Sequence, residues 1–174
     1  MNLEKLYKEY GNMVYNLALQ YVQNIEDAEE ITQDVFVAIH RSMNTFREES
    51  SLSTWIYQIA INKSLDFIKA KKRKKRFGIF TNLFSDDHNS ELNMPVEFNH
   101  PGVQMEDKQA LQLLFKQINS LPDNQKTALI LHKIENLPQA EVARIMKLSP
   151  KAVESLVQRA KNGLTKKIKD SEGL

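Results

Sequence analysis

The chain has 174 residues, 41% of them hydrophobic and 26% charged, which is the balance of a globular protein made of one ordinary domain or two small ones. It contains no cysteine, so disulfide bonds, thiolate zinc sites and thiol nucleophiles are excluded. No apolar run approaches the ~20 residues of a membrane span, and the N-terminus lacks the features of a secretory signal. We therefore expect a cytoplasmic protein with no direct membrane insertion.

The net charge of +2 conceals blocks of opposite sign along the chain. The net charge is −5 over residues 1–60, +7 over residues 61–76 and −6 over residues 77–107. It is +2 over residues 108–136 and +4 over residues 137–174. Alternating blocks suggest separate surfaces for separate partners. The two most basic blocks, 61–76 and 137–174, are candidate contacts for a polyanion.

The N-terminal part of the chain is predicted to be helical. Apolar residues recur in steps of three and four over 3–22 and 28–43, which indicates two helices with one buried face each. Residues 24–27 offer a turn and cap between them. A polar loop over 44–53 follows, and Ser53 or Thr54 is predicted to cap a third helix.

The chain then changes character over residues 77–105, which contain two prolines, many Asn, Ser and Asp residues and no lysine or arginine. We interpret this segment as a flexible linker. Helical periodicity returns in residues 106–174, where Pro122 suits a first helical position. The prediction is an all-α protein of two small helical domains, 1–76 and 106–174, joined by a flexible linker.

Residues 137–168 carry the most specific pattern, that of a helix-turn-helix in the second domain. Pro138 can open a short helix, and Ser149 followed by Pro150 suits the start of a second. An apolar stripe runs along this second helix. The polar face opposite suits a DNA major groove, because Arg and Lys fit guanine edges, Gln fits adenine and Glu accepts from cytosine. That face holds Lys151, Glu154, Ser155, Gln158, Arg159 and Asn162. Two amphipathic helices of an ordinary bundle are the alternative.

The segment KAKKRKKR at 69–76, here called the basic run, places seven cations in eight residues at the end of the third helix. The cations complement the helix dipole and could bind phosphates by counterion release. Alone, the run would equally fit a nuclear-targeting signal, a membrane-surface patch or a solvated face. Nearby aromatic residues suggest single-stranded DNA, since bases stack on them. Phe46 is the better candidate because Trp55 falls on the apolar stripe, and Asn62 could hydrogen-bond an unstacked base.

Carboxylates crowd the start of the second helix in the sequence EDAEE at 26–30 and at Asp34. They stabilise the helix dipole, and they could also form a docking face for a basic protein. The four histidines are too dispersed to form a metal site, and no glycine-rich phosphate loop or Ser/His/Asp arrangement is visible. We expect no metal, no cofactor and no catalytic residue.

Three segments, taken in order, resemble the extracytoplasmic-function (ECF) sigma factors of the sigma-70 superfamily. DAEEITQDVFVAIHRSMNTF resembles their core-binding region, STWIYQIAINKSLDFIKAKKRK their promoter-melting region, and LPDNQKTALILHKIENLPQAEVARIMKLSPKAVESLVQRAKNGL their promoter-binding region. The order and spacing make the resemblance specific, and it covers nearly the whole chain except the linker. The acidic N-terminal extension and middle domain of larger sigma factors are lacking, which points to the minimal two-domain group.

The resemblance implies roles for individual positions. The surface that docks on core RNA polymerase would comprise Asp27, Glu30, Gln33, Asp34 and Phe36. The site that captures a flipped base of the −10 element and follows its backbone would comprise Phe46, Arg47, Ala60, Asn62, Lys63, Lys69, Lys71, Lys72 and Arg73. The −35 element would be bound by Lys126, at a position where a phosphate-contacting Arg is usual, and by Lys151, Glu154, Ser155, Gln158 and Arg159.

Three positions depart from the family pattern. Lys147 stands in the turn where Gly is common, and a left-handed conformation there would cost roughly 1 kcal/mol. Ala152 replaces a usual Thr, and Glu154 a usual basic residue. Both of these changes bear on the −35 sequence that is read, and the acidic side chain is expected to read a base or pair with a neighbouring cation.

The resemblance predicts a sigma factor that catalyses nothing itself and directs core RNA polymerase to promoter DNA. A membrane-linked anti-sigma protein would hold it inactive by covering the polymerase-binding faces. Two alternatives are a stand-alone helix-turn-helix regulator that binds duplex DNA without polymerase, and a nucleic-acid enzyme that uses the carboxylates of 26–30 with a metal.

Overall fold

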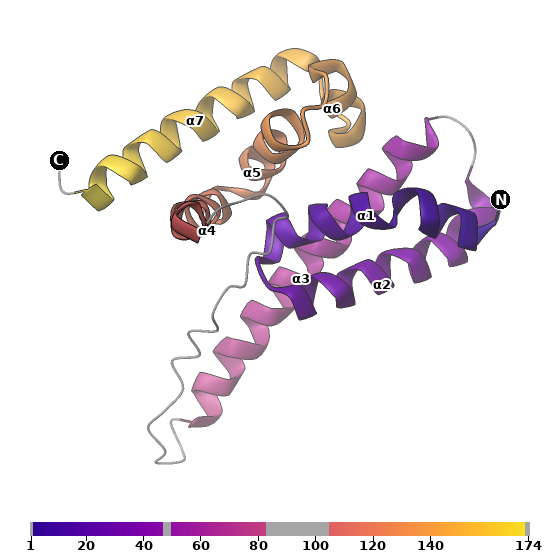
Figure 1. Ribbon diagram of the computed structural model, residues 1–174, viewed down its shortest axis with the longest axis horizontal. Helices are drawn as coiled ribbons and strands as arrows, with labels where there is room; N and C mark the ends of the chain where they lie inside the picture. Colours follow the sequence, from indigo (N-terminus) through magenta and orange to yellow (C-terminus); the bar gives the residue numbers. More distant parts are fainter. Residues whose placement is uncertain (1, 47–49, 83–104, 173–174) are drawn as a thin grey trace.

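The computed structural model describes residues 2–46, 50–82 and 105–172 of the chain. All regular structure within these ranges is helical, so the all-α prediction is confirmed (Figure 1). The first group of helices is α1 (Leu3–Val22), α2 (Ile25–Ser42) and α3 (Leu52–Asn82), and the second is α4 (Met105–Asn119), α5 (Asp123–Leu129), α6 (Gln139–Met146) and α7 (Pro150–Glu172). None of the described helices is long and apolar enough to cross a membrane.

The helices α1 and α2 pack against each other and against α3 through the apolar stripes that the sequence predicts. The fully buried side chains at the centre of this group are Val14, Leu17, Ile31, Val35, Ile39 and Ile56. Asn2 caps α1 by accepting a hydrogen bond from the Glu4 N–H at 2.9 Å, and Asn24 caps α2 by accepting one from the Asp27 N–H at 2.8 Å. These caps satisfy amide groups that have no partner inside the helix.

The cap of α3 is Ser51, so the prediction of Ser53 or Thr54 is wrong. The Ser51 hydroxyl accepts a hydrogen bond from the Thr54 N–H at 3.1 Å, and the Ser51 carbonyl accepts one from the Trp55 N–H at 3.1 Å. Four hydroxyl residues lie within 50–54, and the apolar stripe does not decide which of them begins the helix. At its other end α3 continues past the basic run to Asn82. The flexible linker is predicted over 77–105, but residues 77–82 continue α3 and Met105 begins α4. The remaining linker residues, 83–104, lie outside the described residues.

The second group packs α5, α6 and α7 around buried apolar residues, with α4 against α7. Its core side chains include Phe115, Ile118, Ala128, Ile130, Leu131, Val142, Val153 and Ala160. Pro122 directly precedes α5. The chain then continues from α5 into a π-helical turn, Ile130–Ile134, in which the Glu135 N–H donates to the Ile130 carbonyl at 2.9 Å. Such widened turns are rare in proteins and have no simple sequence signature. This one ends with Glu135 beside the first group of helices.

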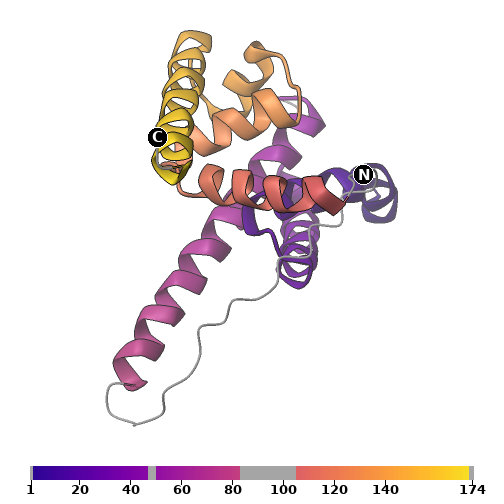
Figure 2. The same ribbon diagram turned by 60° about the vertical axis from the view of Figure 1, so that its left-hand side comes forward.

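The two groups of helices are in direct contact. α4 and α5 approach the end of α1, and α6 lies beside the beginning of α3 (Figures 1 and 2). The Asn119 side chain donates to the Gln20 carbonyl at 3.1 Å, and the Gln58 side chain donates to the Arg144 carbonyl at 3.3 Å. The C-terminal part of α3 extends away from both groups, so the end of the basic run projects from the body of the molecule, whereas Lys71 near its beginning contacts Asp27 of α2 (Figure 2).

Candidate nucleic-acid interface

A groove of about 980 Å³ runs between α2 and α3. Asp27, Glu30 and Asp34 line one wall, because steps of three and four residues place them on one face of α2. The basic run lines the other wall, and the ammonium of Lys71 forms an ion pair with the carboxylate of Asp27. Exposed ion pairs contribute only about 0–1 kcal/mol, so Lys71 can exchange this partner for a phosphate at little cost.

The predicted polymerase-docking residues divide into exposed and supporting positions. Glu30, Gln33 and Asp34 are exposed on α2, and Asp27 is half-buried by its pairing with α3. Phe36 is buried, with 6% of its surface exposed, and its ring meets the ring of Tyr7 edge-on with centroids 4.8 Å apart. Phe36 therefore supports this face from beneath. Tyr7 is 56% exposed, although it belongs to the apolar stripe of α1.

The predicted −10 residues at the start of α3 likewise have different exposures. Phe46 is half-buried against Trp55, with ring centroids 4.9 Å apart and an interplanar angle of 39°. Asn62 is exposed on α3, whereas Ala60 is fully buried in the core and shapes the site only through its small volume. Arg47 lies outside the described residues.

The predicted cationic contacts to the −10 backbone lie along one helix. Lys63 is half-buried where it lines the groove, and the side chains of the basic run that follow are exposed, among them Lys69, Lys71, Lys72 and Arg73. A projecting helix with this charge produces a strong positive potential, and Lys and Arg side chains there can follow a nucleic-acid backbone without reading its sequence.

In the second group, α6, a short turn and α7 form the predicted helix-turn-helix. The turn passes through Lys147, which adopts the left-handed conformation at φ 55° and ψ 44°. Ser149 then caps α7, its hydroxyl accepting from the Ala152 N–H at 3.2 Å. The cap at Ser149 agrees with the sequence prediction, and Lys147 has the left-handed conformation whose cost is considered in the sequence analysis. Val142, Ala143 and Ile145 form the buried inner face of α6.

The two faces of α7 are clearly separated. Val153, Val157 and Ala160 are buried against α5 and α6. All of the predicted reading residues on α7 are exposed, namely Lys151, Glu154, Ser155, Gln158 and Arg159. Gln158 donates a hydrogen bond to Asn162 at 3.1 Å within this face, so the amide is already oriented on the helix surface.

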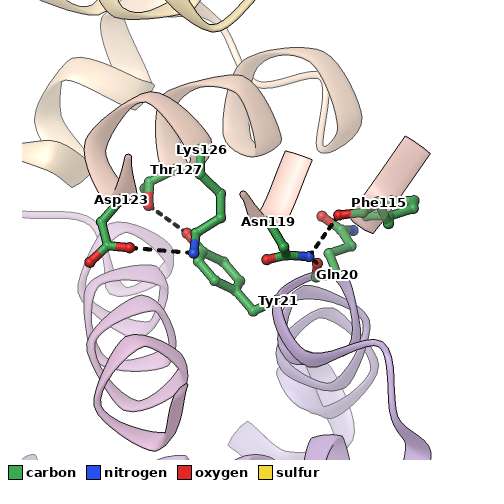
Figure 3. Close-up of polar contacts among 7 residues, drawn as sticks. All are labelled: Gln20, Tyr21, Phe115, Asn119, Asp123, Lys126 and Thr127. Carbon is green, nitrogen blue, oxygen red and sulfur yellow. Dashed lines mark hydrogen bonds and ion pairs between the residues drawn. The ribbon is translucent and has the colours of Figure 1, made fainter. Parts of the chain in front are cut away.

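Lys126 differs from the other predicted −35 residues because it is buried, with 2% of its surface exposed. Its ammonium lies 3.4 Å from the Asp123 carboxylate and 5.4 Å from the centre of the Tyr21 ring (Figure 3). Burial lowers the pKa of Lys126 from its usual value, with a smaller contribution of the same sign from Lys72 and Lys69, while Asp123 opposes the shift. Lys126 is thus held between the two groups of helices.

The comparison with protein families assigns both parts of the chain. The model of sigma-70 region 2 matches residues 6–74, and the model of sigma-70 region 4 matches residues 111–163. The chain belongs to the sigma-70 family. Its sigma region 2 is the first group of helices, and its sigma region 4 is the second.

Curated relatives place this sigma factor in the ECF group. It is 29% identical to the ECF RNA polymerase sigma-E factor of Haemophilus influenzae, over 94% of this chain and 85% of the relative. It is 26% identical to the ECF RNA polymerase sigma-E factor of Escherichia coli K12, over 91% of this chain and 82% of the relative. The predicted recognition and function are confirmed: the chain is a sigma factor that binds core RNA polymerase and directs it to promoters through regions 2 and 4, and it is not an enzyme.

Solved structures share the fold. CnrH, in complex with the cytosolic domain of CnrY, superposes with a TM-score of 0.67 at 18% identity, covering 97% of this chain and 88% of that chain. The sigma factor RpoE, crystallised with the anti-sigma factor NepR from Bartonella quintana, superposes with a TM-score of 0.62 at 19% sequence identity. The match covers 95% of this chain and 96% of that chain.

Neither alternative function agrees with these findings. A stand-alone helix-turn-helix regulator would leave the match of residues 6–74 to sigma-70 region 2 unexplained. A metal-dependent nucleic-acid enzyme would leave the matches of residues 6–74 and 111–163 to sigma-70 regions unexplained.

The sequence did not identify several residues that join the two regions. Glu135 accepts hydrogen bonds from the Gln20 amide at 2.6 Å and from the Tyr57 hydroxyl at 3.2 Å. The hydroxyls of Tyr21 and Thr127 form a buried hydrogen bond of 2.6 Å. No local pattern marks these positions, because each pair is separated by most of a domain and by the predicted linker.

Proposed function

We propose that the acidic face of α2 is the surface that docks on core RNA polymerase. Glu30, Gln33 and Asp34 are exposed there, and the carboxylates give a negative potential suited to a basic partner. Phe36 contributes by holding the face rigid from beneath. Asp27 links this surface to the promoter-binding side through its ion pair with Lys71.

We further propose that the start of α3 captures an unstacked base of the −10 element. The half-buried ring of Phe46, which packs at a tilt against Trp55, presents an aromatic surface for a base, and the exposed Asn62 can hydrogen-bond to its edge. The cations from Lys63 through the basic run then neutralise the phosphates of the melted strand.

The proposal for the −35 element is that α7 enters the major groove. The observation that carries it is the separation of the two faces of α7, with its apolar face buried in region 4 and every predicted reading residue exposed on the other. The capped N-terminus of α7 adds free amide groups and a positive dipole end for a phosphate. Glu154, where a basic residue is usual in the family, favours a cytosine or a salt bridge at its position.

The solved structures of CnrH with CnrY and of RpoE with NepR support a further partner. We propose that an anti-sigma protein binds this chain and covers its polymerase-docking face. The proposed site of action is the cytoplasm, where the polymerase works. We assign residues 1–76 to the contacts with core polymerase and the −10 element, and residues 106–174 to the contact with the −35 element. Residues 77–105 would connect the two.

Run-off transcription with purified bacterial core polymerase, performed with and without the chain, tests the proposal. The templates are promoters recovered by selecting bound DNA. Asp34→Lys is expected to abolish promoter-specific transcripts by removing core binding, and Arg159→Ala to reduce them by weakening the −35 contact. Glu9→Lys on α1 and Lys116→Ala on α4 are matched controls, because both residues are exposed outside the proposed surfaces. Equal transcription from Asp34→Lys and Glu9→Lys would contradict the assignment of the docking face.

A further inference from the structure

The C-terminal part of α3 carries four cations and an aromatic ring on one of its sides. Steps of three and four residues bring five side chains together along this helix. They are Lys69, Lys72, Arg73, Arg76 and Phe77, which we call the outer face of α3. All five residues are exposed, and for Phe77 the exposed fraction is 76%. The spacing therefore gives the helix one continuous surface that is both strongly positive and aromatic.

The outer face lies opposite the side of α3 that packs on region 2. Lys71 follows Lys69 by two positions, a rotation of about 200° on an α-helix, and its ammonium pairs with the Asp27 carboxylate of α2. Further back on the side of Lys71, Ala60 and Ser64 are fully buried. The outer face points the other way, and where its long side chains border the groove between α2 and α3 they remain exposed.

The positive charge of this part of the chain is not offset by neighbouring acidic residues. Between Asp66 and Asp86 the sequence contains seven cations and no carboxylate. The Asp27 carboxylate pairs with Lys71, which is not part of the outer face. One helical turn is about 5.4 Å and the Debye length at physiological salt is about 8 Å, so cations on successive turns act together on a charged surface.

We propose that the outer face of α3 adsorbs on membrane surfaces that contain anionic lipids. A cluster of roughly four to eight Lys or Arg residues on a helix with an apolar component attracts anionic headgroups. The Phe77 ring adds apolar area at the boundary between headgroups and acyl chains. The adsorption is peripheral and reversible, and none of the described helices could cross the membrane. This inference goes beyond the proposed function and does not rest on it.

Phe77 is the residue that favours a lipid surface over a nucleic-acid backbone as the partner of the whole outer face. Lys and Arg side chains are sufficient to follow phosphates. An interfacial helix needs apolar and basic residues together, and the sequence from Phe77 to Asn82 contains two phenylalanines, an isoleucine and no charge. Lys69, Lys72 and Arg73 are also proposed contacts to the −10 backbone. A chain adsorbed through this face therefore cannot use these three cations for DNA.

Co-sedimentation of the full-length chain with lipid vesicles tests the adsorption. One set of vesicles contains about one third phosphatidylglycerol in phosphatidylcholine, and the other contains phosphatidylcholine alone. At low salt the chain is expected to sediment with the anionic vesicles only. Salt of about 1 M should release it, because the Debye length falls to about 3 Å. A chain that stays in the supernatant with the anionic vesicles, or sediments equally with both sets, would overturn the proposal.

Two pairs of charge variants locate the surface that binds. Arg73→Gln with Arg76→Gln removes two cations from the outer face and should weaken the binding to the anionic vesicles about thirtyfold. Lys166→Gln with Lys169→Gln removes the same charge from exposed positions on α7, and should change the binding by no more than about twofold. Equal weakening by both pairs would show that adsorption follows net charge alone, and the assignment to α3 would be refuted.

Phe77→Ser separates a lipid surface from a nucleic acid. This variant should bind the anionic vesicles about fivefold more weakly. Its binding of a single-stranded oligonucleotide at low salt should not change, which also shows that the variant is folded. Leu113→Ser removes an apolar residue of α4 that is 51% exposed, and it should change neither binding. Vesicle binding by Phe77→Ser as tight as that of the unmodified chain would leave the outer face a nucleic-acid contact, and the proposal would fail.

Discussion

The hydrogen bond between Tyr21 and Thr127 allows a quantitative test of the contact between the regions. Both residues are buried, at 2% and 4% exposure, and their hydroxyl oxygens are 2.6 Å apart. Thr127→Val keeps the shape of the side chain and removes its hydroxyl, which leaves the Tyr21 hydroxyl buried without that partner. A buried polar group stripped of its partner costs about 1–3 kcal/mol.

The double variant separates the hydrogen bond from the burial penalty. Tyr21→Phe and Thr127→Val should each lower the free energy of unfolding by about 1–2 kcal/mol, whereas the double variant should lower it by no more than either single change. Removing both polar partners together leaves an apolar contact of nearly the same shape. The expected coupling energy is therefore about 1–1.5 kcal/mol.

Urea denaturation followed by circular dichroism measures these differences. With an m-value of about 2 kcal/mol/M, a loss of 1.5 kcal/mol lowers the midpoint by about 0.7 M. Ser155→Ala is a control, because its exposed hydroxyl bonds only to the Lys151 carbonyl of its own helix. If the two single effects add in the double variant, the hydroxyls do not pair in solution and the closed arrangement of regions 2 and 4 is refuted.

Three further predictions concern the turn, the cap and the tyrosines. Lys147→Gly should raise the melting temperature of region 4 by a few degrees, about 0.5 kcal/mol, because the left-handed backbone at φ 55° strains a residue with a side chain. Ser149→Ala should destabilise α7 by about 1 kcal/mol in thermal denaturation, and Ser149→Gly by only a few tenths. In a spectrophotometric titration, Tyr21 and Tyr57 should ionise late, since burial raises the pKa of both well above 10.0. Their neutral forms stabilise the folded state fully below pH 10.0, and this contribution is lost as the pH rises above that value. Early ionisation of all five tyrosines would show that the closed contact is absent.

The two faces of each helix could be predicted from the sequence because they depend on spacing within a single segment. The stripes of α1, α2 and α7 bury Val14, Val35 and Val153 as the pattern predicts. Caps are equally local, so a cap within residues 24–27 and one at Ser149 were predicted from the residues around them. The choice of Ser51 was not, because several hydroxyl residues lie at the start of α3 and each could form the first turn.

Apolar character alone did not predict burial where a stripe reaches the edge of a group. Leu114 lies in the apolar pattern of α4 and is 39% exposed, and Ile134 at the end of the π-helical turn is 37% exposed. Which members of a stripe are covered depends on where the neighbouring helix ends. That neighbour is distant in the chain, so spacing within a single helix does not contain the information.

The sequence by itself determined that this chain is helical, that it has two regions of sigma-70 type, and which face of α7 is polar. Only the tertiary structure decided the position of Lys126. The resemblance to the sigma-factor family implies a phosphate contact for Lys126, but its burial depends on Tyr21, a residue more than a hundred positions away. Helix patterns are set by short-range spacing, whereas a contact between two domains depends on how their finished surfaces fit, and no local sequence pattern encodes that fit.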